Sequence, residues 1–222
     1  MMQVIAIGGG GFSEGSEPGL DRYVLEHSRR ASPRIGFLGT ASGDSESYLL
    51  KFYARFAKLD CRPGHLPLFR RTPDLEAWIF AQDIIYVGGG NTKSMLAVWE
   101  GWKLGALLRR AGEAGTILAG ISAGAICWFD FGVTDSASEG LAPMACLGIL
   151  GGNCCPHYSG ERDRRPSYEG LFGAKRFRRA MPSTMARPFT SWMATPSGWS
   201  LGGRRRTPIT SRSSGRLREP VA

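Results

Sequence analysis

The sequence has 222 residues, of which 42% are hydrophobic and 21% are charged, as expected of one soluble globular α/β domain. No apolar run is long enough to span a bilayer. The apolar segment at the N-terminus is too short for a signal peptide and lacks the basic residues of one. The formal charge of +9 arises from the C-terminal part, because residues 170–222 hold 11 Lys and Arg against one acid, whereas residues 1–169 hold 17 against 18. The neutral body therefore argues against nucleic acid as its partner.

Strand-like and helix-like segments alternate along the first 122 residues. Continuous apolar runs predict buried strands at 3–7, 34–40, 83–92 and 116–122, the third ending in glycines. Helical periodicity predicts helices at 19–30, 45–58, 73–82 and 92–111, the last with a break near Gly101, and 61–69 is strand or loop. Apolar strands that alternate with helices predict an α/β fold, a three-layer αβα sandwich with a mostly parallel sheet.

Three glycine-rich loops follow the predicted strands, at 8–11, 88–91 and 120–124. Sites in parallel sheets form at the carboxyl ends of strands, so we expect a site where these loops meet. The third loop reads Gly-Ile-Ser-Ala-Gly and matches the nucleophile elbow, a strand-to-helix turn that lifts a serine hydroxyl above the sheet. Ser122 is the candidate nucleophile, and a Gly/Ser turn without chemistry is the alternative.

A serine nucleophile needs a base, and the chain has three histidines. His27 lies in a polar helix face and His65 in a Pro/Gly segment, so both are interpreted as structural or surface residues. His157 is therefore the candidate base. An acid should orient its imidazole, and Asp135 gives the order Ser, Asp, His, with Glu139 and Glu161 as rivals.

Three motifs together carry a family resemblance, YVGGGNT at 86–92, GISAGAICWF at 120–129 and CPHYSGERDRRPSY at 155–168. Residues 1 to about 169 resemble peptidase E (dipeptidase E) and the cyanophycinase-like serine peptidases. The resemblance implies a class I glutamine amidotransferase-like fold. It also implies Ser122 as nucleophile, His157 as base and an oxyanion hole formed by the N–H groups of Gly89 and Ala123.

The resemblance implies a small peptide as substrate, for example a dipeptide with N-terminal Asp, or an aspartyl-arginine linkage as in cyanophycinase. The candidate substrate-binding residues are Asn91, Glu161 and Arg165, and Arg162 and Arg164 are further candidates to pair with a carboxylate. Two alternatives are a non-catalytic amidotransferase-like binding module and a nucleic-acid binder acting through the basic tail. For the assembly, a homodimer is the expectation that the sequence leaves open.

Cofactor and metal sites are not indicated. Adjacent Cys154 and Cys155 with His157 do not suit tetrahedral metal ligation, and no second ligand pair exists. The loop at 8–11 lacks the P-loop lysine and fits G-x-G-x-x-G poorly. Five cysteines without a CxxC pair favour reduced thiols and a cytoplasmic location.

Residues 170–222 form an atypical basic tail in which no helix or strand period persists. We interpret it as a frameshifted replacement of a C-terminal helix and strand hairpin. The codons for residues 192–194, Trp-Met-Ala, contain TGGATGGC, which reads Asp-Gly in a shifted frame and is a hairpin signal. A basic tail that binds acidic partners or RNA is the alternative, and sequencing DNA across codons 160–180 would decide between them.

Overall fold

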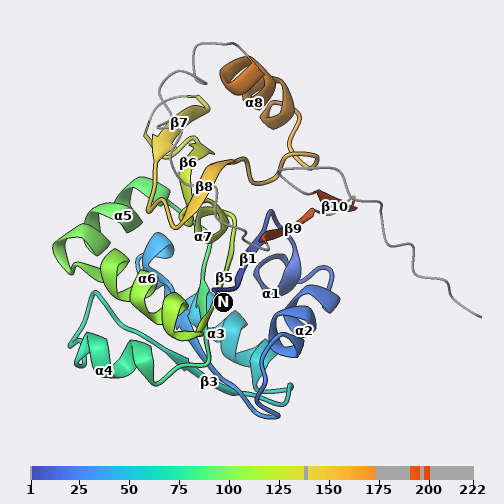
Figure 1. Ribbon diagram of the computed structural model, residues 1–222. Helices are drawn as coiled ribbons and strands as arrows, with labels where there is room; N and C mark the ends of the chain where they lie inside the picture. The colour runs from blue at the N-terminus through green and yellow to red at the C-terminus, as the bar shows by residue number, and fades with distance from the viewer. Residues whose placement is uncertain (1, 138–139, 174–190, 196–197, 201–222) are drawn as a thin grey trace, which may run out of the picture.

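The computed structural model describes residues 2–137, 140–173, 191–195 and 198–200. A seven-stranded sheet with the order β10-β9-β1-β5-β4-β2-β3 forms its centre (Figure 1). Every neighbouring pair in it is parallel except β9 and β10. The strands are β1 (Val4–Ile7), β2 (Arg34–Leu38), β3 (Arg62–His65), β4 (Ile84–Val87), β5 (Ile117–Ile121), β9 (Ser191–Thr195) and β10 (Gly198–Ser200).

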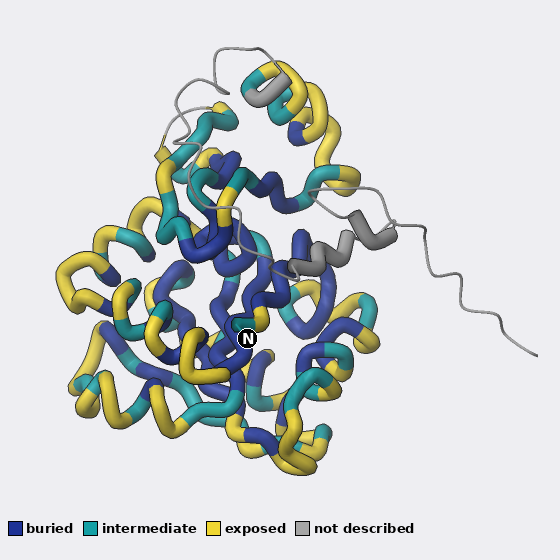
Figure 2. Tube along the Cα trace, in the orientation of Figure 1, coloured by how far each residue is buried: buried dark blue, intermediate teal, exposed yellow. Residues whose placement is uncertain are grey.

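Helices cover both faces of this sheet, so the predicted three-layer αβα sandwich is confirmed. On one face, Ile5, Phe37 and Tyr86 pack with apolar side chains of the first three helices, α1 (Gly11–Glu14), α2 (Gly19–Glu26) and α3 (Glu46–Phe56). On the other face, Leu38 and Val87 pack with α4 (Leu75–Phe80), α5 (Thr92–Gly101) and α6 (Leu104–Ala114). Figure 2 shows the buried strands between helices whose outer sides are exposed.

The predicted elements agree with the observed ones within a few residues. Strands β1, β4 and β5 are buried along their whole length, which explains their continuous apolar sequences. The expected break in the helix at 92–111 separates α5 from α6, and Lys103 at the break has φ 53°. None of the described helices is long and apolar enough to cross a membrane.

A second, three-stranded sheet follows the glycine-rich loop at 120–124, with the order β7-β6-β8. Its strands β6 (Phe129–Thr134), β7 (Ala142–Ala145) and β8 (Leu150–Cys154) lie with helix α8 (Arg164–Gly173) at the top of Figure 1. The predicted boundary between body and tail, 169/170, falls inside α8. Within the predicted tail, β9 and β10 join the main sheet beside β1, and the other tail residues after α8 lie outside the described part of the chain.

Candidate active site

Ser122 lies at an abrupt turn between a buried strand and a short helix. Strand β5 ends at Ile121, and helix α7 (Ala123–Ile126) begins directly after the serine. The backbone of Ser122 has φ 55° and ψ −113°, a conformation that L-residues rarely adopt, and its N–H donates to the Ile7 carbonyl at 2.9 Å. This strained turn is that of a nucleophile elbow, which presents the hydroxyl above the sheet.

Glycines on both sides of the serine make this turn possible. A Cβ on Gly120 would lie 2.1 Å from the carbonyl oxygen of Gly124, and a Cβ on Gly124 would lie 2.2 Å from that of Val87. No side-chain rotation relieves contacts this short, because they would be made with backbone atoms. The G-x-S-x-G pattern is therefore a packing requirement of the turn.

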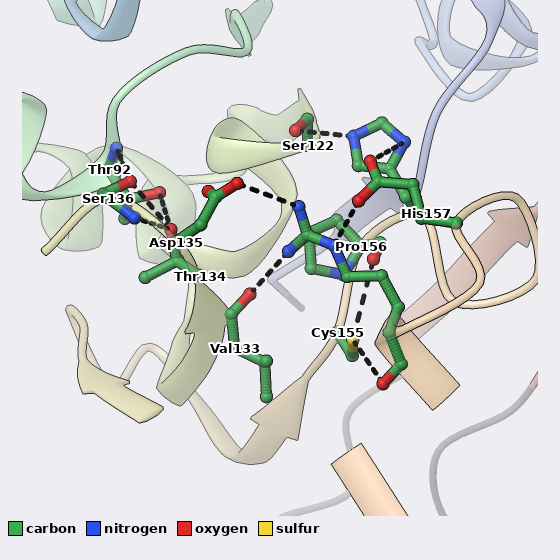
Figure 3. Close-up of polar contacts among 11 residues, drawn as sticks. Thr92, Ser122, Val133, Thr134, Asp135, Ser136, Cys155, Pro156 and His157 are labelled. Atoms are coloured by element: carbon green, nitrogen blue, oxygen red, sulfur yellow. Dashed lines mark hydrogen bonds and ion pairs between the residues drawn. The ribbon is translucent and has the colours of Figure 1, made fainter. Parts of the chain in front are cut away.

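The imidazole of His157 reaches the serine hydroxyl from the loop after β8. Nε2 of His157 and Oγ of Ser122 are 2.9 Å apart and share a hydrogen bond (Figure 3). The backbone of His157 has φ 53°, and its N–H donates to the Gly8 carbonyl at 3.1 Å, so the end of β1 anchors the loop. The structure thus brings together the two residues that the sequence proposes as nucleophile and base.

The other two histidines are engaged elsewhere. Nδ1 of His27 lies 2.7 Å from the Tyr23 carbonyl oxygen, and Nδ1 of His65 lies 2.8 Å from the Tyr53 hydroxyl. The first contact is a hydrogen bond at the end of α2, and the second joins the edge strand β3 to α3. Both histidines therefore have structural surroundings, as the sequence predicts.

Glu161 is the carboxylate within ion-pair range of the imidazole, among the residues that the structure describes. Its Oε1 is 3.9 Å from Nδ1 of His157, within ion-pair range but too long for a hydrogen bond. Its Oε2 accepts a hydrogen bond from Nε of Arg164 at 2.7 Å. The carboxylate thus lies between the imidazole and a guanidinium, close enough to orient the ring after a small side-chain rotation.

Asp135 lies apart from His157 (Figure 3), contrary to the expectation that it is the third member of a triad. It follows the last residue of β6, and its side chain is 68% exposed. The next residue, Ser136, accepts a hydrogen bond from the Thr92 N–H at 2.9 Å. This contact leads the chain toward the start of α5 and away from the histidine loop.

Arg164 occupies the space between the two acids. Its side chain is only 7% exposed, and besides its bond to Glu161 it donates to the Val133 carbonyl at 3.3 Å. An Nη atom lies 3.8 Å from Oδ2 of Asp135. This guanidinium has three protein partners, so it is not available for a substrate carboxylate. Glu139, the remaining rival acid, lies outside the described residues.

The amide of Gly89 lies against Ser122 but already has an acceptor. A Cβ on Gly89 would lie 3.2 Å from Cβ of Ser122, which places the two backbones side by side. The Gly89 N–H donates to the Tyr48 hydroxyl at 3.1 Å, and that hydroxyl donates to Oγ of Ser13 at 2.9 Å. Burial raises the pKa of Tyr48, so the phenol keeps its proton. Tyr48 was missed from the sequence, because its place on the apolar face of its helix indicates only packing.

A cavity of about 320 Å³ opens at the serine. The residues that line it include Glu14, Tyr48, Lys51, Gly89, Ser122 and His157.

Two of the predicted substrate-binding residues have other roles. Asn91 caps α5, with its Oδ1 accepting the Ser94 N–H at 2.8 Å, and Arg165 pairs with Glu169 at 2.9 Å on the exposed side of α8. The described residues that line the cavity do not include either of them.

Comparisons with known proteins show the family of this chain. The model of peptidase family S51 matches residues 4–178. The chain belongs to peptidase family S51. It is 53% identical over 177 residues to the uncharacterized peptidase YgaJ of Bacillus subtilis (strain 168), covering 79% of this chain and 76% of that one. The family resemblance and the peptidase activity class are therefore confirmed.

Solved structures agree on the fold of this S51 peptidase. A provisionally assigned peptidase E protein from Listeria monocytogenes EGD-e matches with a TM-score of 0.52 at 18% identity, over 68% of this chain and 76% of that one. A peptidase from an acI-B1 Actinobacterium matches with a TM-score of 0.50 at 17% identity, over 87% and 79% of the two chains. At these identities the likeness concerns the fold alone.

The thiols of this S51 peptidase are unsuited to act as nucleophiles. The five cysteines, all of them described, form no disulfide, and Cys127, Cys154 and Cys155 are buried. Burial raises the pKa of Cys155 to about 11 and that of Cys146 to about 12, so both thiols stay protonated near neutral pH. Among the described residues, no group of three His, Cys, Asp or Glu side chains is arranged to hold a metal ion.

Proposed function

We propose that this S51 chain is a serine peptidase that hydrolyses short peptides, with Ser122 as nucleophile and His157 as general base. The hydrogen bond of 2.9 Å between Oγ of Ser122 and Nε2 of His157 carries this proposal. A serine is a weak nucleophile by itself, and an imidazole at this distance can take its proton during attack. The dipeptide with N-terminal Asp that the family resemblance suggests is the proposed preferred substrate.

The reaction follows from the positions of these two groups. Ser122 Oγ attacks the peptide carbonyl carbon while His157 Nε2 takes the hydroxyl proton. The same nitrogen then gives that proton to the leaving amine, and the C–N bond breaks to leave an acyl-serine. A water molecule, deprotonated by His157, hydrolyses the ester and restores the free serine hydroxyl.

The oxyanion is proposed to lie between the start of α7 and the Gly89 loop. The Ala123 N–H follows the nucleophile directly and opens the helix, so it faces developing negative charge. The Gly89 N–H is the second proposed donor, and in the resting enzyme it is held by the Tyr48 hydroxyl. An oxyanion entering here therefore competes with, or receives a hydrogen bond from, that phenol.

Glu161 is proposed as the acid that orients the imidazole, in place of Asp135. A rotation that shortens the 3.9 Å contact to Nδ1 would fix the tautomer with Nε2 free to accept the serine proton. The guanidinium of Arg164 holds the carboxylate in place through its 2.7 Å bond.

Hydrolysis of a panel of Asp-X dipeptides, with a β-aspartyl-arginine dipeptide included, tests the proposed function. Ser122→Ala and His157→Ala should each reduce kcat by several orders of magnitude. His27→Ala, a histidine outside the cavity, is the matched control and should keep its activity. Hydrolysis that survives either active-site substitution contradicts the mechanism. A folded wild-type protein that neither turns over nor reacts with a fluorophosphonate at Ser122 would instead be a binding module.

A further inference from the structure

Two opposite charges line the cavity at the serine, and the proposed chemistry uses neither of them. They are the carboxylate of Glu14 and the ammonium of Lys51. Both side chains are exposed, and neither has an ion-pair partner within 4.0 Å among the residues that the structure describes, including each other. Most surface charges have no specific ligand, but two unpaired charges of opposite sign in one small cavity match a ligand that carries both signs.

Glu14 is held next to the imidazole. A Cβ placed on Gly9 would be 3.0 Å from Oε1 of Glu14 and 2.9 Å from Nδ1 of His157, so both groups border the same point. The short helix α1 that carries Glu14 is anchored by buried Asp21, whose Oδ1 accepts the Phe12 N–H at 3.2 Å. The backbone position of Glu14 relative to the serine is therefore defined by the fold.

Lys51 lies on α3, three residues after Tyr48. Its Nζ lies 3.4 Å from the carbonyl oxygen of Ser13, the residue whose hydroxyl also receives the Tyr48 hydrogen bond. The ammonium thus lies on the Tyr48 side of the cavity, where the Gly89 amide lies. A carbonyl oxygen is a weak partner for an ammonium, so a carboxylate can replace it favourably.

We propose that Glu14 and Lys51 recognise a short zwitterionic peptide, with the α-ammonium on Glu14 and a carboxylate on Lys51. The inference rests on the proposed function of Ser122, because it places the peptide bond between the two charges at the nucleophile. A cavity of about 320 Å³ is at the small end of ligand sites, which suits a dipeptide. Lys51 thereby takes the role that the sequence suggested for Arg165.

The carboxylate on Lys51 has two sources in a dipeptide such as Asp-Leu, the aspartate side chain and the C-terminal carboxylate. Binding to the Ser122→Ala protein, measured by titration calorimetry, distinguishes them. Asn-Leu lacks the first carboxylate, Asp-Leu amide lacks the second, and N-acetyl-Asp-Leu lacks the ammonium. Lys51→Met should weaken the binding of Asp-Leu about tenfold. It should also abolish the discrimination against either Asn-Leu or Asp-Leu amide, whichever lacks the carboxylate that Lys51 binds.

Glu14→Gln should weaken the binding of Asp-Leu by a similar factor and remove the discrimination against N-acetyl-Asp-Leu. Lys51→Arg should restore most of the affinity, because it keeps the positive charge. Lys58→Met and Glu26→Gln, exposed charges away from the cavity, are the matched controls and should bind like the parent. Unchanged affinity in both cavity variants, or no binding of Asp-Leu to the parent, overturns the inference.

The failure of this inference and that of the proposed function are distinguishable. If Asp-Leu binds with the expected charge dependence but wild-type protein does not hydrolyse it, the charge pair stands and the serine mechanism fails. If wild-type protein hydrolyses Asp-Leu and KM is the same in the Lys51→Met and Glu14→Gln variants, the serine mechanism stands and the charge pair fails.

Discussion

Replacing Gly9 by alanine should slow the enzyme at least tenfold without unfolding it. A Cβ at this position would lie 2.9 Å from Nδ1 and 3.2 Å from Cε1 of His157. Favourable contacts between such atoms begin at about 3.5 Å, so the ring must move by roughly half an ångström. The ring is also engaged at 2.9 Å by Ser122, so this shift misaligns the proton acceptor with the hydroxyl. A displacement on the order of 1 Å costs about 100-fold in rate, and we expect a loss of tenfold or more here.

Stability should change much less than activity. Gly9 is absent from the glycines with positive φ, so its backbone suits alanine, and the added methyl group costs about 1 kcal/mol or less after local adjustment. Gly64→Ala is the matched control, because no atom lies within 4 Å of its Cβ position and its φ is also not positive. Thermal unfolding of the two variants therefore separates a displaced imidazole from a damaged fold.

The assay is the rate at which a fluorophosphonate labels Ser122, which reports nucleophile activation without requiring the natural substrate. Gly9→Ala should slow labelling, and Gly64→Ala should not. The effects of Gly9→Ala and His157→Ala should not add, because both act through the same imidazole. A Gly9→Ala protein that folds and is labelled at the wild-type rate would refute the predicted clash between the added methyl group and the imidazole of His157.

Three further predictions follow from the site. Glu161→Gln should lower kcat about tenfold or more while Asp135→Asn leaves it unchanged, and the reverse order would restore Asp135 as the acid. Tyr48→Phe should alter kcat more than KM, because it removes the partner of the Gly89 N–H; an effect confined to KM would contradict this. The pKa of Cys155 is about 11 in the folded protein against 9.0 for an ordinary thiol, so the protonated thiol stabilises the fold fully below pH 9.0. This stability is lost as the pH rises toward 11. Cys155→Ala should therefore reduce the fall in unfolding free energy with rising pH, measured by denaturant unfolding.

The parallel core could be predicted because its sequence signals are strong and local. Strands such as 84–87 and 117–121 are buried on both faces, so they appear as continuous apolar runs bounded by glycines. The elbow at Ser122 could be predicted for the same reason, since only glycine fits beside it. The second sheet was not predicted, because β7 is half-exposed and contains a proline, and β8 contains two glycines.

The acid that lies beside His157 could not be predicted, because it depends on the paths of two loops. Asp135 and Glu161 lie on opposite sides of His157 in the chain, and spacing does not decide which of them turns toward the ring. The Thr92 N–H draws the residue after Asp135 toward α5, through a contact between residues far apart in the chain. Arg164 holds Glu161 beside the imidazole through a local (i, i+3) contact, but its guanidinium is itself placed by a long-range bond to the Val133 carbonyl. Neither of the two long-range contacts has a local sequence pattern.

The proposed nucleophile and the proposed base have the same backbone feature, a positive φ without being glycine. Ser122 has φ 55° and His157 has φ 53°, and each conformation costs on the order of 1 kcal/mol or more. Each is held by one hydrogen bond to the end of the same strand, from Ser122 to the Ile7 carbonyl and from His157 to the Gly8 carbonyl. The neighbouring carbonyls of Ile7 and Gly8 thus anchor both strained turns. Residues far apart in the sequence meet within hydrogen-bonding distance because β1 supplies the anchor for each.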